Sequence, residues 1–386
     1  MRRPLGASLA ALALVAAGCG QGGNETDIDV SGTATAAPTG TVQDGEITFA
    51  VDGVPDVVAT IASGLATPWG LDFLPDGRAV VTERDSARVL LVTAPEVGKN
   101  GTDEEGTVVE VGRIPEADPR GEAGLLGVAV SPTFATDGLV YFYVCTAEDN
   151  RVVRARLDGD RLGEPEPILT GIPGGTIHDG GRLAFGPDGH LYVSTGETGE
   201  PRLARNRKGF AGKILRITTD GKPAPNNPFG TVVWSWGHRN VQGLAFDPDG
   251  SLWATEFGER KADELNRILP GEDYGWPVVE GTGGPQRFTQ PSMTWRTSEA
   301  SPSGLAYAGG YLWMASLQGE RLWRIKVAAG QVSDPTAYFE GADAGEYGRL
   351  RTVVRAPDGR LWLTTSNEDG RGAPAPDDDR ILLVEP

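Results

Sequence analysis

The sequence predicts an all-β fold, a six-bladed β-propeller whose blades are four-stranded antiparallel sheets. One motif recurs six times, and its markers are separated by 57, 55, 61, 61 and 48 residues. Each copy joins a short apolar strand to an alternating strand through a hairpin turn, and no long helical pattern is evident. Blades repeated at such intervals close into a ring that leaves only short sheet edges.

The repeated motif is clearest in three copies. Residues 70–77 read GLDFLPDG, residues 182–189 read RLAFGPDG and residues 243–250 read GLAFDPDG. Degenerate copies are marked by Pro132, Gly309 and Pro357. The Pro-Asp-Gly segment is typical of a hairpin turn, because Pro presets one turn torsion and Gly accepts a left-handed one.

The remaining strands of each blade follow from the same pattern. Residues 251–256 alternate apolar and polar side chains after their turn, as a half-buried strand does. Residues 212–217 and 320–325 predict third strands. Residues 56–61 precede the first marker, and we expect them to complete the last blade beside residues 381–384.

Three regions are expected along the chain. Residues 1–19 read as a lipoprotein signal peptide, because two arginines precede an apolar run of 13 residues, shorter than the ~20 that span a bilayer. Small residues lead to Cys19, the expected site of lipidation, although an ordinary secreted protein is the alternative. Residues 20–48 are expected to be a flexible polar tether, and residues 49–386 the propeller.

Composition excludes several classes of protein. The 35 Lys and Arg face 53 Asp and Glu, a net charge of −18, which repels phosphate backbones and disfavours nucleic acid as a partner. Hydrophobic residues make up 39% of the chain, enough for a sizeable core. Besides Cys19 the only cysteine is Cys145, so we expect no intramolecular disulfide and a buried thiol.

Polar residues share one phase of the repeat, just before the marker of each blade. The innermost strands of a propeller line its channel, so residues that precede them should converge at one mouth. Those residues are Glu122, His178, Arg239, Asn240, Arg349 and Arg351. Such a set favours a polar ligand site, and the alternative is solvated residues with salt bridges between blades.

Two further features have specific chemical uses. Arginines beside an amide suit a planar ligand that carries carboxylates. Residues 256–266 could offer carbonyl and carboxylate oxygens to a hard cation such as Ca²⁺, although they do not match an EF-hand.

From about residue 64 onward the chain resembles the soluble PQQ-dependent glucose dehydrogenase and aldose sugar dehydrogenase family of propellers. The resemblance rests on GHRNVQG at residues 237–243, on DELN at 263–266 followed by YGWP at 274–277, and on His178 four residues before Arg182.

This resemblance implies PQQ across the channel mouth, with a Ca²⁺ ion that polarises the quinone. His178 matches the general base and Glu197 the carboxylate that orients it, and Glu122 falls at a substrate-contacting position. The positions that match PQQ contacts are Arg239, Asn240, Arg349, Arg351 and Gln318. The metal would take the backbone carbonyls of Gly258 and Glu259, and a further Ca²⁺ would be held near Glu264 and Tyr274.

The chain departs from the family pattern at three of these positions. Gln318 stands where the family often has a Lys, so one positive charge near PQQ is missing. Glu259 replaces a Pro at the second carbonyl position, and Phe257 replaces a polar neighbour.

The expected function is oxidation of an aldose at C1 to its lactone, with hydride transfer to PQQ and electrons passed to an external acceptor. The protein would lie outside the cytoplasm, anchored to the membrane by lipid at Cys19. Two alternatives are a non-catalytic lipoprotein that binds a sugar or a partner, and a Ca²⁺-dependent hydrolase of the lactonase kind.

Overall fold

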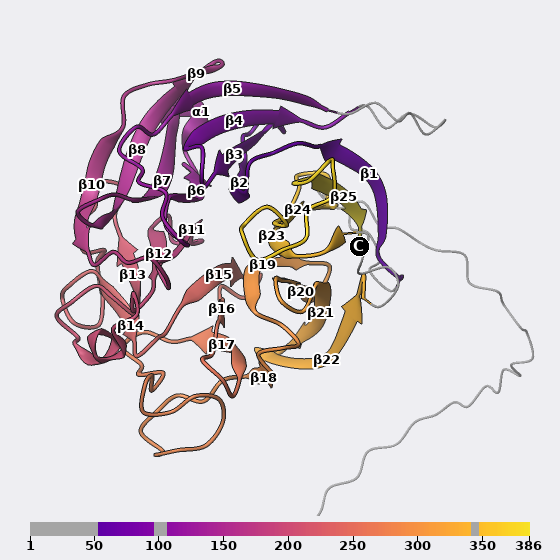
Figure 1. The fold of residues 1–386 in the computed structure, drawn as a ribbon. Coiled ribbons are helices and arrows are strands. Elements are labelled where there is room, and N and C mark those ends of the chain that lie inside the picture. Colours follow the sequence, from indigo (N-terminus) through magenta and orange to yellow (C-terminus); the bar gives the residue numbers. More distant parts are fainter. Residues whose placement is uncertain (1–52, 96–105, 341–346) are drawn as a thin grey trace, which may run out of the picture. The chain divides into compact units, whose positions relative to one another are not determined.

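The strands of the chain form six antiparallel sheets arranged in a ring (Figure 1). This computed structural model describes residues 53–95, 106–340 and 347–386. Each sheet is one blade, and the predicted six-bladed β-propeller is confirmed. The expected signal peptide, Cys19 and the expected tether lie outside the described residues.

The blades are numbered here by their innermost strands. Blade 1 contains β2 (Pro68–Phe73), β3 (Ala79–Glu83), β4 (Arg88–Thr93) and β5 (Thr107–Arg113). Blade 2 contains β6 (Leu125–Val130), β7 (Leu139–Cys145), β8 (Asn150–Asp158) and β10 (Glu166–Ile172), with the short β9 (Arg161–Leu162) beside β8. Blade 3 contains β11 (Gly180–Phe185), β12 (Leu191–Thr195), β13 (Lys213–Ile217) and β14 (Val233–Trp236).

The second half of the ring has the same plan. Blade 4 contains β15 (Val241–Phe246), β16 (Leu252–Glu256), β17 (Asp263–Ile268) and β18 (Met293–Trp295). Blade 5 contains β19 (Pro302–Ala308), β20 (Tyr311–Ser316), β21 (Arg321–Ala328) and β22 (Gln331–Tyr338). Blade 6 contains β23 (Leu350–Arg355), β24 (Leu361–Thr365), β25 (Ile381–Glu385) and β1 (Asp56–Ala62). The described residues add two short helices, α1 (Phe134–Asp137) and the 3₁₀ helix η1 (Pro201–Arg205).

Blade 6 closes the ring with strands from both ends of the described chain. β1 pairs antiparallel with β25, so that Asp56 lies opposite Glu385 and Ala62 opposite Ile381. This is the closure that the sequence predicts: the strand that precedes blade 1 in the chain becomes the outermost strand of blade 6.

The glycines of the repeat serve two different purposes. Gly77 in the hairpin turn has φ +88°, a left-handed torsion, and its N–H donates to the Leu74 carbonyl at 3.0 Å. Gly127, on an inner strand, is needed for close packing, since a Cβ there would lie 2.1 Å from the carbonyl oxygen of Gly181 in the next blade. The inner strands therefore approach one another around a narrow channel.

Arg182 stands where four of the other five copies of the motif have glycine, and its side chain bridges the channel. Its Nε donates to the Gln242 carbonyl at 2.7 Å, and its Nη2 donates to Thr352 Oγ1 at 3.0 Å. The guanidinium lies 4.3 Å from the ring centre of Trp69. Arg182 thus links blade 3 to blades 1, 4 and 6, and burial lowers its pKa to about 9.

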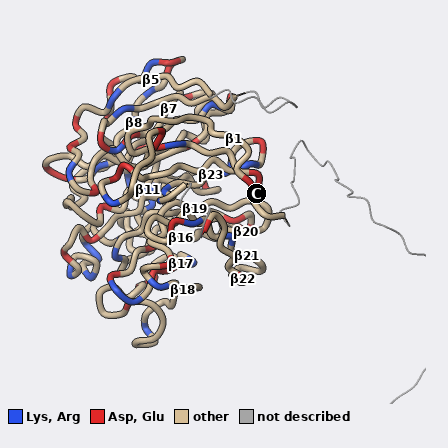
Figure 2. Tube along the Cα trace, turned by 45° about the vertical axis from the view of Figure 1, so that its right-hand side comes forward, with Lys and Arg blue, Asp and Glu red and all other residues tan. Residues whose placement is uncertain are grey.

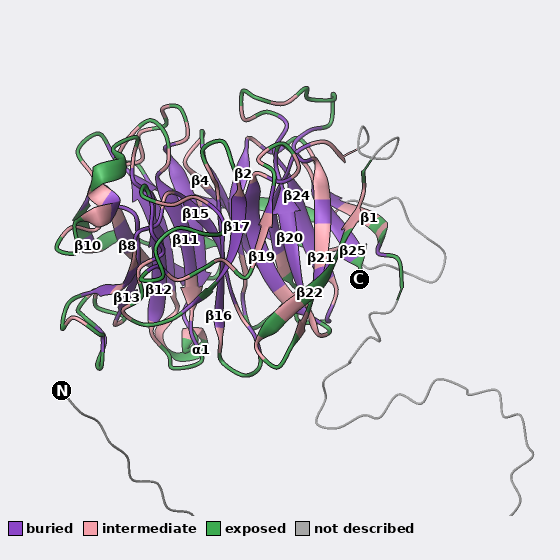
Figure 3. Ribbon diagram, turned by 90° about the horizontal axis from the view of Figure 1, so that it is seen from below, coloured by how far each residue is buried: buried purple, intermediate pink, exposed green. Residues whose placement is uncertain are grey.

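The hydrophobic core lies between neighbouring blades, where strands are buried on both faces (Figure 3). Val80 and Val89 of blade 1, for example, pack in one cluster with Val128 and Phe142 of blade 2. Cys145 is a buried free thiol, as expected. Basic and acidic residues are interspersed along the described ring (Figure 2). Within the described residues, no helix has the length and apolar character that crossing a bilayer requires.

Candidate active site

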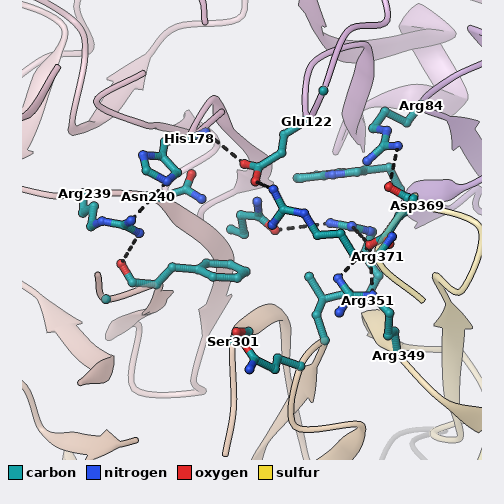
Figure 4. Close-up of a pocket in the computed structure, with 18 of the residues that line it drawn as sticks. Arg84, Glu122, His178, Arg239, Asn240, Ser301, Arg349, Arg351, Asp369 and Arg371 are labelled. Carbon is teal, nitrogen blue, oxygen red and sulfur yellow. Dashed lines mark hydrogen bonds and ion pairs between the residues drawn. The ribbon is translucent and has the colours of Figure 1, made fainter. Parts of the chain in front are cut away.

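A cavity of about 560 Å³ lies at one mouth of the channel, and all six blades contribute residues to it (Figure 4). Two kinds of segment supply them. One is the segment that enters each innermost strand, which brings in Glu122 and His178. The other is the loop after the second strand of a blade, which brings in Arg84, Gly258 and Asp369.

Most of the residues predicted for the site converge on this cavity. Those that line it are Glu122, His178, Arg239, Asn240, Gly258, Gln318, Arg349 and Arg351. Glu197 is buried behind His178 and contacts its ring. Glu259, Glu264 and Tyr274 are not among the residues that line the cavity.

His178 is held at three points. Its backbone has φ +57°, and its N–H donates to Glu122 Oε2 at 2.9 Å. Nδ1 of the ring is hydrogen-bonded to Glu197 Oε1, and Nε2 lies 3.1 Å from Arg239 Nη2. A guanidinium can only donate, so Nε2 must carry the lone pair and Nδ1 the proton. The contact with Arg239 thus assigns Nε2 of His178 as the acceptor nitrogen.

Arginines dominate the charged lining of the cavity. Arg349 and Arg351 both donate to Asp369 Oδ2, with Nη2 at 2.8 and 3.2 Å respectively. Arg84 pairs with Asp85 through Nε and Nη2, at 2.6 and 3.0 Å. In all, five arginines and three carboxylates line the cavity, in a chain whose net charge is −18. The cavity therefore suits an anionic ligand.

The pKa shifts of Asp369 and Arg351 indicate which groups on this side of the cavity are charged. Burial alone would raise the pKa of Asp369, but Arg351 and Arg349 outweigh it, and the pKa lies below its ordinary value. Burial lowers the pKa of Arg351 to about 10. Asp369 and Arg351 are thus charged at neutral pH, and the carboxylate is shared between the guanidinium groups of Arg351 and Arg349.

These residues fit PQQ, whose carboxylates need several donors. Within the described residues, the Arg239 guanidinium donates to no carboxylate: its Nη1 donates to the Phe257 carbonyl at 3.3 Å and its Nη2 faces His178. The carboxylates of the ligand would neutralise the positive charge of Arg239 and the excess positive charge of Arg349 and Arg351, which share Asp369. Asn240 is fixed in the same wall, because its Oδ1 accepts the Gly180 N–H at 3.0 Å.

A calcium ion bound here would be coordinated by backbone carbonyl oxygens rather than by a cluster of carboxylates. Within the described residues, no group of three or more His, Cys, Asp or Glu side chains is placed to hold a metal. Gly258 lines the cavity and Glu259 follows it in the chain. Two carbonyls are a partial set for Ca²⁺, which takes six to eight oxygens, so other contacts would come from bound ligand and water.

Glu264 and Tyr274 lie in blade 4 and in its loop, apart from the cavity lining. Glu264 accepts the Gly281 N–H at 2.7 Å and the Asn266 amide at 3.0 Å. Burial, with the nearby Glu256 carboxylate, raises its pKa. The Tyr274 hydroxyl donates to the Arg267 carbonyl at 2.6 Å, so that phenol is already engaged.

The sequence reasoning missed several residues that line the cavity, including Arg84, Asp369 and Arg371. Arg84 follows β3, and Asp369 and Arg371 follow β24, so all three come after the second strand of a blade. Gln318 and Gly258 occupy the same kind of loop after β20 and β16. Applying the repeat phase to this second loop would have located them.

Comparison with known proteins gives a consistent set of relatives. The sequence pattern of the glucose / sorbosone dehydrogenase family matches residues 65–374. The PQQ-bound aldose sugar dehydrogenase of Streptomyces coelicolor is 51% identical, over 86% of this chain and 97% of that chain, with a TM-score of 0.81. The aldose sugar dehydrogenase of Escherichia coli is 27% identical, over 81% of this chain and 91% of its own length. Quinoprotein glucose dehydrogenase B of Acinetobacter calcoaceticus is 33% identical, over 57% of this chain and 52% of its own length.

Proposed function

This chain belongs to the glucose / sorbosone dehydrogenase family, and from that membership we propose that it oxidises an aldose at C1 to the lactone, with PQQ and Ca²⁺. One observation carries the proposal: the cavity-facing Nε2 of His178 is an acceptor, with Glu197 on the far nitrogen and arginines around it. That arrangement combines a general base with a wall for an anionic cofactor.

The chain's own part in the reaction is to hold the sugar and take its proton. PQQ, when bound, supplies a two-electron acceptor for the hydride that leaves C1. As the hydride leaves, Nε2 of His178 accepts the proton of the C1 hydroxyl, and the C1–O bond becomes the lactone carbonyl. The Glu197 carboxylate stabilises the imidazolium that forms. The electrons then pass to an external acceptor.

Cofactor and metal are assigned as follows. Arg239, Asn240, Arg349 and Arg351 would bind the PQQ carboxylates, with Gln318 as a neutral donor beside them. The carbonyls of Gly258 and Glu259 would bind the Ca²⁺ that polarises the quinone. A further Ca²⁺ is proposed near Glu264 and Tyr274.

Neither alternative function gains support from a specific feature. A lactonase of the propeller kind would need carboxylate or amide ligands around one metal, and the described residues place no such acidic cluster. A pure binding module would have no use for a buried carboxylate on the far nitrogen of His178.

The test is a spectrum of the purified protein with PQQ and Ca²⁺, recorded before and after an aldose is added. Reduction of the quinone by an aldose, and none without sugar, is the expected result. A bound quinone that no aldose reduces would favour the binding module. Hydrolysis of a lactone in the absence of PQQ would favour the hydrolase.

Location is a separate proposal that rests on the N-terminal sequence. We propose that Cys19 is lipidated and that the propeller is anchored outside the cytoplasm. Cells grown with labelled palmitate should yield labelled protein, and Cys19→Ser should abolish the label. Equal labelling of both forms would contradict the anchor.

A further inference from the structure

The loop between β16 and β17, residues 257–262, approaches the cavity at one end and leaves it at the other. Phe257 and Gly258 line the cavity, whereas Glu259 is exposed. The direction of each carbonyl in this loop decides which oxygens face a bound ligand. Those directions depend on where the N–H groups of the loop are bound.

One carboxylate oxygen binds four consecutive N–H groups of this loop. Glu280 Oε1 accepts from Glu259 at 2.7 Å, from Arg260 at 2.8 Å, from Lys261 at 2.8 Å and from Ala262 at 3.3 Å. One carboxylate oxygen therefore fixes the loop through four N–H groups.

The planar peptide unit converts these bonds into carbonyl directions. In a trans peptide the carbonyl of one residue points opposite to the N–H of the next. The cis bonds among the described residues lie at 276–277 and 378–379, outside this loop. Because the N–H groups of Glu259 and Arg260 point at Glu280, the carbonyls of Gly258 and Glu259 point away from it.

The preceding peptide is fixed by a second carboxylate. The Gly258 N–H donates to Asp263 Oδ1 at 2.8 Å, which turns the Phe257 carbonyl away from Asp263. That carbonyl accepts from Arg239 Nη1 at 3.3 Å. Two acidic side chains thus orient three consecutive carbonyls, and the first of them is already bound to a cavity residue.

Close packing shows that the position of Glu280 is specific. A Cβ on Gly258 would lie 2.7 Å from Glu280 Oε1 and 2.1 Å from the Ala262 carbonyl oxygen. Only glycine leaves room for the carboxylate to reach the N–H groups. The residue after Glu280 is also fixed, because the Gly281 N–H donates to Glu264 Oε1 at 2.7 Å.

We propose that Glu280 is a positioning residue for the metal: by binding the N–H groups of residues 259–262, it holds the carbonyls of Gly258 and Glu259 ready for Ca²⁺. This inference rests on the proposed function, in which those carbonyls bind the ion. Glu280 touches neither metal nor cofactor in this role. Its effect is to preorganise two oxygens that would otherwise rotate with the loop.

The test measures how much Ca²⁺ the protein needs to bind PQQ. Tryptophan fluorescence would follow PQQ binding to the full chain at free Ca²⁺ set by EGTA buffers. Glu280→Ala should raise the Ca²⁺ needed for half-maximal binding by about 10- to 100-fold, as lost outer-shell contacts do. Glu280→Gln should cost less, since its amide oxygen still accepts. Glu272→Gln removes an exposed carboxylate nearby and should change nothing.

Amide hydrogen exchange provides a second measurement, which does not require bound metal. The amides of residues 259–262 should exchange faster in both Glu280 variants than in the wild type. A Glu280→Ala protein with wild-type Ca²⁺ dependence would overturn the inference, and so would slow exchange in that variant. If Glu280→Ala does not fold, the exchange rates of residues 259–262 in Glu280→Gln decide, and exchange as slow as in the wild type would overturn the inference. Wild-type PQQ binding that EGTA leaves unchanged would instead overturn the proposed metal.

Discussion

Glu122 and Arg371 meet across the mouth of the cavity, with Oε1 of the carboxylate 2.7 Å from Nη2 of the guanidinium. The other oxygen of Glu122 accepts the backbone N–H of His178. One carboxylate from the segment that enters β6 therefore touches both a blade 6 loop and the proposed base. The Arg371 side chain is 61% exposed, so the pair adds less than about 1 kcal/mol to stability.

The first prediction concerns Glu122 as a support for His178. Glu122→Ala should slow quinone reduction by up to about 10²-fold, because a displacement of ~1 Å of a catalytic group can cost that much. Glu122→Gln keeps an acceptor for the His178 N–H and should lose much less. Single-turnover kinetics would measure both, and equal rates in the two variants would contradict the support.

His178→Gln should keep PQQ binding but lose most of the hydride-transfer step. Removing a general base typically lowers the rate by about 10²–10⁴-fold. Stopped-flow spectra of PQQ-loaded protein mixed with aldose would give this rate directly. Wild-type reduction in the variant would remove His178 from the mechanism, and loss of PQQ binding would make it a cofactor ligand.

Arg351→Ala should weaken PQQ binding by about 10- to 100-fold, the effect of losing a charged hydrogen bond of ~1.5–3 kcal/mol. Asp369 would remain paired with Arg349, so the cavity wall should stay folded. Fluorescence titration with PQQ would measure the change. Arg113→Ala, at an exposed arginine of blade 1, is the matched control, and equal affinities in both variants would refute the placement of PQQ.

Gln318→Lys should tighten PQQ binding, because it adds a positive charge to the exposed rim of the cavity. The gain should shrink as salt is added, since an exposed charge is screened. Titrations at low and high ionic strength would show both effects. Weaker binding by the lysine variant would mean that this rim contacts something other than PQQ.

The last prediction is a pH dependence of stability at Asp179, a buried carboxyl. Burial raises its pKa to about 6, and its Oδ2 has no partner within the described structure. Below about pH 4 the group is protonated in both states; as pH rises to 6 the unfolded chain ionises first. The stabilisation that this carboxyl contributes is therefore lost as the pH rises through its unfolded and folded pKa values. The total loss is about 3 kcal/mol.

Asp179→Asn removes this titration and keeps the Oδ1 acceptor for Asn150 and Gly175. The stability of the variant minus that of the wild type should be about 2 kcal/mol larger at pH 7 than at pH 4. Urea unfolding at the two pH values would measure the difference. The exposed Asp160→Asn should show no such trend, and a flat difference for Asp179→Asn would contradict the burial effect.

The blades could be read from the sequence because turn residues and strand alternation repeat locally. The same periodicity predicts His178, Arg239 and Arg349 at one mouth, and all three line the cavity. The periodicity does not predict contacts between loops that are distant in the sequence. Nothing near Glu122 marks Arg371 as its partner, since that partner lies 249 positions away in the chain. Glu280 was missed for the same reason: no local pattern shows which N–H groups a loop carboxylate will bind.

The position of Arg182 affects the order in which a sugar and an electron acceptor would reach the cofactor. Its side chain contacts the Gln242 carbonyl, the Thr352 hydroxyl and the Trp69 ring, so it crosses the channel beneath the cavity. Under the proposed function, the sugar and the electron acceptor would both reach the cofactor from the cavity side. The lactone would then have to leave before the acceptor could take its place, and the two half-reactions would alternate. The kinetics should then be those of a double-displacement enzyme, in which the two substrates compete for the same binding site.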